Sequence, residues 1–126
     1  MMRLIVGISG ATGVQIGYRL LEVLSQRGDN EVHLVVSEGA KVIFDRETDV
    51  TMQEVEALAD VVWDNRNLAA AISSGSFVTE GMIVAPCSMK SLSAIANAYD
   101  DDLLVRAADV FAKEGARWCW FRARCP

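Results

Sequence analysis

Short apolar runs alternate with helical segments along most of this chain. Residues 4–8 (LIVGI), 32–36 (VHLVV) and 82–85 (MIVA) are apolar without alternation, which is typical of strands buried on both faces of a parallel sheet. Residues 61–63 predict a further short strand. Because helical patterns separate these runs, the sequence predicts an α/β sandwich around a parallel sheet.

The helical segments have recognisable start and stop signals. Residues 13–27 predict a helix that Gly28 ends, and the small residues Gly13 and Gly17 allow this helix to approach the sheet closely. The other predicted segments are a short helix at 40–45, a helix from a Thr51/Glu54 capping box to Ala59, an Ala-rich helical turn at 67–72, a flexible polar loop at 73–76, a helix from the Ser88 cap to about Ala98, and a helix that opens at residues 100–102 and closes at Lys113.

Composition indicates a single domain. The chain has 126 residues, of which 52% are hydrophobic and 23% charged, so we expect one real core and no extensive disorder. No apolar run approaches the ~18–20 residues that cross a bilayer, so we expect a soluble, cytoplasmic protein with no membrane contact. The net charge of −5 argues against nucleic acid or anionic lipid as a partner.

Ligands of open α/β sheets bind beyond the carboxyl ends of the strands, and the first such exit is glycine-rich. Residues 7–13 (GISGATG) offer the hydroxyls of Ser9 and Thr12 and the amides of the following helix, which suit a phosphate. The spacing is neither a dinucleotide fingerprint nor a P-loop. A tight strand-to-helix turn explains the pattern equally well.

Two further strand exits carry polar groups. Ser37 follows the second strand, where it can contact a ligand or cap the next helix. Residues 86–91 (PCSMKS) combine two hydroxyls, a thiol, helix amides and one ammonium, which suit a phosphate or an electron-rich ring. A helix cap followed by a solvated lysine is the alternative.

Other candidates carry less chemistry. His33, the only histidine, lies inside a predicted strand, and we expect it to be structural. Glu47 could act as a general acid or base, although surface carboxylates are common. Residues 100–102 are most simply a helix start. The cysteines at 87, 119 and 125 form no zinc or disulfide pattern, so we expect no metal.

In combination, these segments resemble the UbiX-type flavin prenyltransferases, a family also known as aromatic or phenolic acid decarboxylases and as 3-octaprenyl-4-hydroxybenzoate carboxy-lyase partner proteins. The resemblance covers residues 2–114. The blocks that carry it are RLIVGISGATG at 3–13, VHLVVS at 32–37, ETD at 47–49, ISSGSF at 72–77, PCSMKSLS at 86–93, RAADV at 106–110 and KE at 113–114.

The resemblance implies a Rossmann-like (flavodoxin-like) three-layer sandwich that binds FMN. It further implies transfer of a dimethylallyl group from dimethylallyl phosphate to FMN, giving prenyl-FMN for a UbiD-type decarboxylase, in a homo-oligomer without a metal. Glu47 would be the acidic residue beside the flavin and the dimethylallyl phosphate. The residues that would contact FMN are Gly10, Ala11, Thr12, Ser37, Ser88, Met89, Lys90 and Ser91.

The resemblance stops near Gly115, where the composition changes. Residues 115–126 hold three of the 12 basic residues and no acidic one, which leaves nine basic and 17 acidic residues, a net of −8, in residues 1–114. Reading this tail one base out of register, with permissible codons, gives GREVVLVPREMP, a buried strand followed by the family's Pro-Arg-Glu motif.

We therefore expect residues 1–114 to be the N-terminal part of an FMN-binding domain that is incomplete at its C-terminus, and 115–126 to be an out-of-frame tail. Ala123 and Arg124 stand where the family has its flavin-contacting arginine and the following glutamate. We expect a central strand to be lost or replaced and prenyltransferase activity to be impaired. The alternatives are a non-catalytic FMN-binding fragment or pseudogene product, another flavin-dependent decarboxylase-like protein, or a divergent natural terminus.

Overall fold

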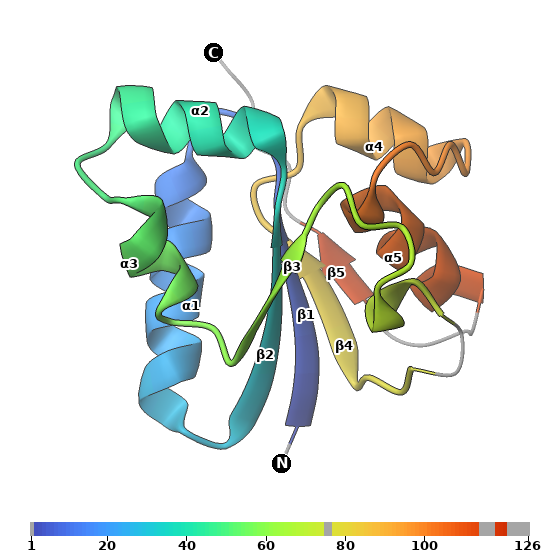
Figure 1. The fold of residues 1–126 in the computed structure, drawn as a ribbon, viewed down its shortest axis with the longest axis horizontal. Helices are drawn as coiled ribbons and strands as arrows, with labels where there is room; N and C mark the ends of the chain where they lie inside the picture. Colours follow the sequence, from blue (N-terminus) through green and yellow to red (C-terminus); the bar gives the residue numbers. More distant parts are fainter. Residues whose placement is uncertain (1, 75–76, 114–117, 121–126) are drawn as a thin grey trace.

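Five parallel strands form the centre of the molecule in a computed structural model, which describes residues 2–74, 77–113 and the backbone of 118–120 (Figure 1). Their order in the sheet is β3-β2-β1-β4-β5. The strands are β1 (Met2–Ile8), β2 (Asn30–Val36), β3 (Val61–Asp64), β4 (Gly81–Val84) and β5 (Trp118–Trp120). The expected parallel α/β architecture is confirmed.

The order of the strands reverses at β1. The chain moves outward from β1 to β2 and β3, then returns to place β4 on the other side of β1. β1 pairs with β2 from Met2↔Asn30 to Ile8↔Val36 and with β4 from Leu4↔Gly81 to Gly7↔Val84. A reversal of this kind leaves a crevice at the carboxyl ends of the two strands that flank it.

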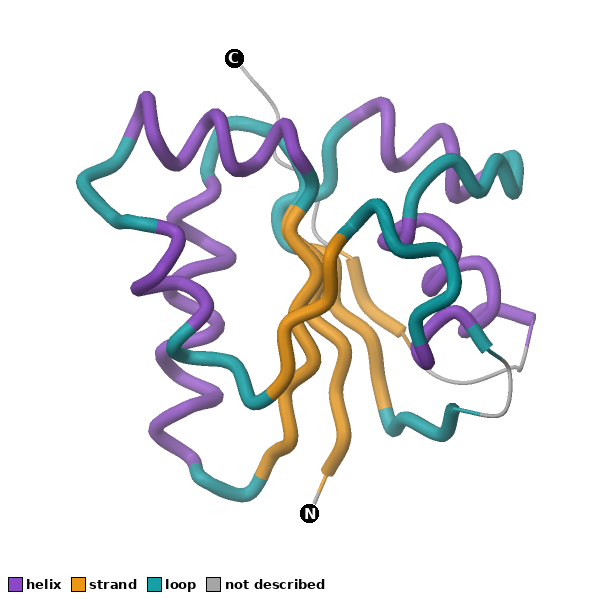
Figure 2. Tube along the Cα trace, in the orientation of Figure 1, coloured by secondary structure: helices purple, strands orange, loops and turns teal. Residues whose placement is uncertain are grey.

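Helices cover both faces of the sheet (Figures 1 and 2). On one face lie α1 (Val14–Arg27), α2 (Glu38–Glu47) and α3 (Met52–Glu56); on the other lie α4 (Met89–Ala96), α5 (Leu103–Lys113) and the short 3₁₀ helix η1 (Ala71–Ser73). Within the described ranges, none of these helices has the length and apolar character needed to span a membrane.

Each face of the sheet has its own hydrophobic core. The core beneath α1, α2 and α3 comprises Val6, Ile8, Val14, Leu21, Val32, Leu34, Val36, Ala40, Phe44 and Val55. The core beneath α4 and α5 comprises Ile5, Val35, Ala70, Ile72, Met82, Val84, Cys87, Leu103, Leu104, Ala107, Ala108 and Phe111. Because β1 and β2 contribute side chains to both, their predicted burial on two faces is confirmed.

Several helix boundaries differ from the sequence predictions. The helix expected at 40–45 begins at Glu38, because the Ser37 hydroxyl accepts a hydrogen bond from the Ala40 amide. The helix expected to reach Ala59 ends at Glu56 and continues only as turns. The Ala-rich turn expected at 67–72 is helical only in η1.

Glycines fix the position of α1. Gly13 and Gly28 flank the helix with φ values of +98° and +72°, in the left-handed region that favours glycine. A Cβ atom on Gly17 would lie 2.5 Å from the Ala85 carbonyl oxygen. The expected close approach of α1 to the sheet is therefore confirmed at Gly17.

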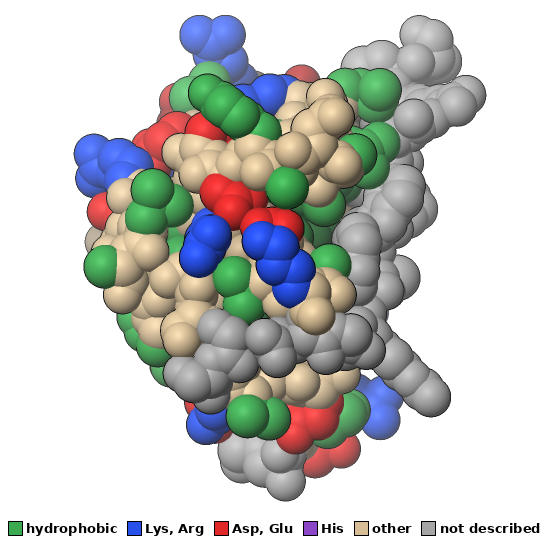
Figure 3. Space-filling model, turned by 90° about the vertical axis from the view of Figure 1, so that its right-hand side faces the viewer, with side chains coloured by type: hydrophobic (Ala, Val, Ile, Leu, Met, Phe, Trp, Pro, Cys, Tyr) green, Lys and Arg blue, Asp and Glu red, His purple; other side chains and the backbone are tan. Residues whose placement is uncertain are grey.

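The outer surface of the α4 and α5 layer carries acidic and basic side chains next to one another (Figure 3). Arg106 contacts Asp100 at 3.0 Å and Lys113 contacts Asp109 at 3.1 Å. Burial, followed by the hydrogen bond with Asp109, raises the pKa of Asp100. Burial alone would raise the pKa of Asp109, but hydrogen bonds from Lys113 and Asp100 lower it.

A strand occupies the position beside β4 where we expected one to be lost or replaced. The backbone of β5 pairs with β4 in parallel from Met82↔Trp118 to Val84↔Trp120. The other residues of the predicted tail, 115–117 and 121–126, lie outside the described residues, as do Gly75 and Ser76 of the predicted polar loop.

Candidate functional site

The carboxyl ends of β1 and β4 are joined through one buried hydroxyl. Ser9 follows β1 directly, and its Oγ donates to the Pro86 carbonyl oxygen at 2.9 Å and accepts from the Ser88 amide at 2.6 Å. The sequence predicts this hydroxyl as a possible ligand contact. In the structure it instead fixes the glycine-rich turn against the start of α4.

Two helices begin beside this turn with a serine cap. The Ser37 Oγ accepts from the Ala40 amide at 3.1 Å at the start of α2, and the Ser88 Oγ accepts from the Ser91 amide at 3.1 Å at the start of α4. The predicted caps are therefore confirmed. Both helices direct their positive N-terminal ends toward the same space.

Gly10 allows the two walls of this space to approach each other. A Cβ atom on Gly10 would lie 2.9 Å from the carbonyl carbon of Gly39. This is a backbone atom, which cannot move aside as the end of a flexible side chain could. Any larger residue at Gly10 would therefore push the turn away from the start of α2.

These elements border a cleft of about 630 Å³, a size typical of sites for small organic ligands. Six of the nine predicted site residues line it: Gly10, Ser37, Ser88, Met89, Lys90 and Ser91. The other lining residues were not among the predicted site residues: Glu38, Gly39, Asn65, Arg66, Asp101 and Asp102.

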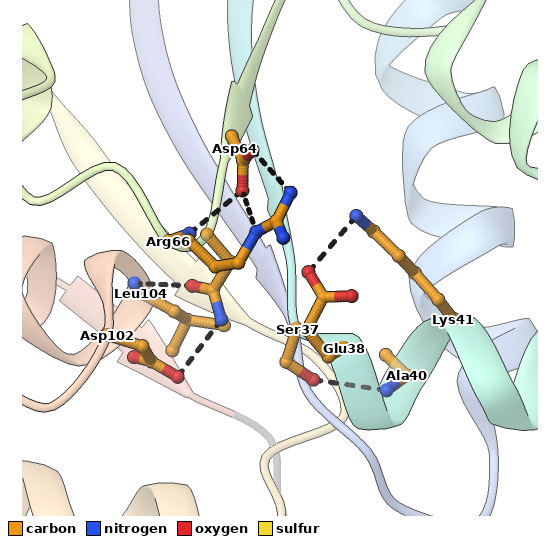
Figure 4. A network of polar contacts seen from close by, with 9 residues as sticks. Ser37, Glu38, Ala40, Lys41, Asp64, Arg66, Asp102 and Leu104 are labelled. Atoms are coloured by element: carbon orange, nitrogen blue, oxygen red, sulfur yellow. Dashed lines mark hydrogen bonds and ion pairs between the residues drawn. The ribbon is translucent and has the colours of Figure 1, made fainter.

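Asn65 connects the end of β3 to the start of α5 on one side of the cleft, through its contacts with Asp102 and Leu104. Figure 4 shows Asp102 and Leu104 on this side, opposite Ser37 and Glu38 at the start of α2. Asn65 is 4% exposed. Its Oδ1 accepts from the Leu104 amide at 2.9 Å, and its Nδ2 donates to Asp102 Oδ2 at 3.0 Å. The position of Asn65 just after a short strand was a signal that could have identified it, because parallel strands end at one edge of the sheet.

The two basic residues that line the cleft in the described part of the chain are each paired with a carboxylate. Arg66 contacts Asp64 at 3.2 Å, and this hydrogen-bonded pair raises the pKa of Arg66 and lowers that of Asp64. Lys90 Nζ lies 2.9 Å from Asp101 Oδ2, and hydrogen bonding to Asp101 raises the pKa of Lys90. Both cations are therefore charged at neutral pH.

The three remaining predicted site residues do not line the cleft. Ala11 and Thr12 follow Gly10 in the same turn. Glu47 is the exposed last residue of α2, whose first residue borders the cleft. At 1.5 Å per residue, the length of α2 separates Glu47 from the cleft by roughly 14 Å.

The Cys87 thiol lies behind the cleft rather than in it. Cys87 is fully buried in the core beneath α4 and α5, and this burial raises the pKa of its thiol. A protonated, inaccessible thiol is a poor nucleophile. Cys87 therefore serves packing.

His33 is structural, as expected. It is 4% exposed, its Nε2 lies 2.7 Å from Glu31 Oε1, and its Nδ1 accepts from the Trp63 indole at 3.0 Å. Both ring nitrogens are thus engaged away from the cleft. Among the described residues, no group of three or more His, Cys, Asp or Glu side chains is placed to hold a metal ion.

Comparison with known proteins identifies the family. The flavoprotein family profile matches residues 1–122. The chain is 60% identical over 116 residues to the "Probable UbiX-like flavin prenyltransferase" of Sedimentibacter hydroxybenzoicus, an alignment that covers 92% of this chain and 61% of that protein. The chain thus spans about three-fifths of the length of this relative.

Two crystal structures have the same fold. AnUbiX (PadA1), in complex with FMN and dimethylallyl pyrophosphate, matches with a TM-score of 0.94 and 44% identity over 99% of this chain and 66% of that one. A dodecameric FMN-dependent UbiX-like decarboxylase from Escherichia coli O157:H7 matches with a TM-score of 0.96 and 47% identity over 99% and 68%. The chain therefore belongs to the flavoprotein family and is a homologue of its UbiX-type flavin prenyltransferases.

Proposed function

We propose that this chain binds FMN in the cleft and transfers a dimethylallyl group to it from dimethylallyl phosphate. The observation that carries the proposal is the cleft itself, which brings together six residues from three separate strand exits that the family resemblance implicates in FMN binding. The similarity in fold to AnUbiX, which binds FMN and dimethylallyl pyrophosphate, supports it.

The residues present fit a flavin mononucleotide. The contact between Gly10 and Gly39 brings the glycine-rich turn against the start of α2 at the edge of the cleft, and the serine-capped starts of α2 and α4 supply backbone dipoles for a phosphate. Bound FMN would be the acceptor of the dimethylallyl group, and its ring is electron-rich enough for this role once a two-electron reductant has reduced it. The part of the protein is to hold both reactants in a fixed, water-poor arrangement.

In the proposed transfer, the bond between the dimethylallyl carbon and the phosphate oxygen breaks, while an electron pair of the reduced flavin forms the new bond to the dimethylallyl group and the flavin gives up a proton to solvent or phosphate. Inorganic phosphate leaves with the electron pair of the broken bond. Lys90, whose raised pKa keeps it protonated, can balance phosphate charge at the cleft. No metal is required for this charge balance.

We also propose that Glu47 acts beside the flavin, and that it does so from a neighbouring copy of the chain. Its position at the far, exposed end of α2 separates it from the cleft of its own copy. A homo-oligomer, as in the dodecameric relative, would allow one copy to complete the site of another. Mixing a Glu47→Gln chain with a chain inactivated in the cleft should then restore activity.

The direct test is to titrate the purified chain with FMN, beside a version whose reading frame is restored after Gly115, and then to reduce the flavin chemically and add dimethylallyl phosphate. We expect both to bind FMN and the restored version to form the prenylated flavin faster, as seen by mass spectrometry. Failure of both to bind flavin would contradict the proposal.

Other outcomes favour the alternatives. Yellow, FMN-bound protein without turnover in either version would indicate a non-catalytic flavin-binding fragment. Decarboxylation of an acid substrate by the FMN-bound protein, without any need for dimethylallyl phosphate, would indicate a different flavin-dependent decarboxylase. A normal rate in the chain as it stands would contradict the expected impairment.

The out-of-frame origin of residues 116–126 is likewise a proposal, supported by the change in composition at Gly115. Resequencing the gene across the Gly115 codon tests it, and an intact frame with the same tail would refute it.

We further propose that the product passes, in the cytoplasm, to a UbiD-type decarboxylase. Activation of such a decarboxylase, freed of its cofactor, by the reaction mixture would support this transfer.

A further inference from the structure

Lys90 occupies a position that disfavours a cation. It is the second residue of α4, where the aligned peptide dipoles give the helix its positive end. The N-terminal end of α4 and the Lys90 ammonium therefore make one wall of the cleft electropositive. In the structure Asp101 compensates this charge, with its Oδ2 2.9 Å from Lys90 Nζ.

The other carboxylates of the cleft are engaged elsewhere. Glu38 contacts Lys41 at 3.4 Å on its own helix. Asp102 caps α5 by accepting from the Val105 amide at 2.9 Å and also accepts from Asn65. Asp101 is thus the lining carboxylate that the described contacts place on Lys90.

An anionic ligand at the start of α4 competes with Asp101. A phosphate interacts with the full charge of Lys90 only if it displaces the Asp101 carboxylate. The displaced carboxylate then remains nearby and repels the phosphate. We propose that Asp101 is a specificity-determining residue, whose pairing with Lys90 lowers the preference of the cleft for phosphate-bearing flavin over flavin without phosphate. This inference rests on the proposed flavin site.

The effect should be modest, because the pair is partly solvated. The Lys90 side chain is 68% exposed and that of Asp101 is 27% exposed. Ion pairs of this kind change an equilibrium constant by about two- to fivefold.

The test compares the affinities for FMN and riboflavin in the full chain and in an Asp101→Asn variant. We expect the ratio of FMN affinity to riboflavin affinity to rise about two- to fivefold in the variant and the gain to shrink at high salt. The matched control is Glu22→Gln, which removes an acidic partner of similar exposure from the Arg19–Glu22 pair on α1, outside the cleft.

A double-mutant cycle separates the pair from the overall charge. In a Lys90→Met background, Asp101→Asn should raise the ratio clearly less than in the unmodified chain, because no ammonium is released. An unchanged or lowered ratio in the single variant would overturn the inference. An equal rise in Glu22→Gln would overturn it as well.

Loss of the proposed function can be distinguished from failure of this inference. If the unmodified chain binds neither flavin, the proposed function fails, and inorganic phosphate becomes the probe. The amide resonances of Ser88, Lys90 and Ser91 should then shift at lower phosphate concentration in Asp101→Asn than in the unmodified chain. Equal titration curves, or no response in either chain, would overturn the inference.

Discussion

The Ser9 hydroxyl links the two strands that flank the cleft. It is fully buried, and it both donates to Pro86 and accepts from Ser88. A buried hydroxyl used twice in this way satisfies two backbone groups at the exit of β4. Ser9 thus contributes to the site by positioning the residues around it.

Replacing Ser9 with alanine should destabilise the fold by about 1–3 kcal/mol, because the Ser88 amide and the buried Pro86 carbonyl each lose a partner. Urea denaturation measures the change. The exposed Ser25 in α1 provides the control, and Ser25→Ala should stay within about 0.5 kcal/mol of the unmodified chain. Equal effects of the two substitutions would contradict the linking role.

The carboxyl of Asp100 should make stability depend on pH. Burial raises the pKa of Asp100 above the usual 3.8, because the folded state favours the protonated carboxyl. The contribution of this carboxyl to the free energy of unfolding is therefore fully present below pH 3.8 and is lost as pH rises through the raised pKa. In the Asp100→Asn variant, the side chain at this position is a neutral amide that does not titrate. The free energy of unfolding of the variant, relative to that of the unmodified chain, should therefore increase between acidic and neutral pH. A difference that stays constant or decreases across that range would refute this assignment.

Among the secondary-structure elements, α1 lies close to the sheet because Gly17 has no side chain. A Cβ atom on Gly17 would meet the Ala85 carbonyl oxygen at 2.5 Å and Ile8 at 2.9 Å. The helix therefore lies against the ends of β1 and β4, directly beneath the turn that carries Gly10. The missing side chain at Gly17 thus fixes how close α1 lies to the sheet.

Gly17→Ala should destabilise the protein by about 1–3 kcal/mol, because the helix must move off the sheet. The sign is diagnostic, since the same substitution in an unobstructed helix stabilises by up to about 1 kcal/mol. Chemical denaturation of this variant and of the exposed control Gln15→Ala would measure it. A gain in stability would show that the close approach is not required.

At this scale the sequence predicted what depends on local pattern. Buried strands, serine caps and strand exits are local, so they identified Gly10, Ser37 and the start of α4. Asn65 and Asp101 escaped because their importance depends on where the end of β3 and the α4–α5 loop meet in space, which no local pattern encodes. The residues alone suggested only that Glu47 could be a general acid or base. Its place beside the flavin came from the resemblance, and one copy of the chain does not bring it to the cleft.

For the whole molecule, one sheet joins two cores. Leu21 is fully buried on the α1 face and Leu104 is fully buried on the α5 face. Because β1 and β2 contribute to both cores, neither face can lose its packing without loosening strands that the other needs. We therefore expect the described fold to unfold cooperatively.

Leu21→Ala and Leu104→Ala should each cost about 2–5 kcal/mol, and each should retain a single transition. Circular dichroism and tryptophan fluorescence should report the same midpoint in each variant. Leu68→Ala, at a side chain that is 49% exposed, should change stability by less than about 0.5 kcal/mol. Separate midpoints by the two probes would show that the two faces unfold independently.

The strand order also has a consequence in time. As the ribosome releases the chain, β1, β2 and β3 emerge with α1, α2 and α3, which cover one face of the nascent sheet. Ile5 and Val35 on the opposite face remain uncovered until α5 has been synthesised, about 40 residues after β3. The interval between β3 and α5 is therefore the stage of synthesis at which this protein most needs protection from aggregation.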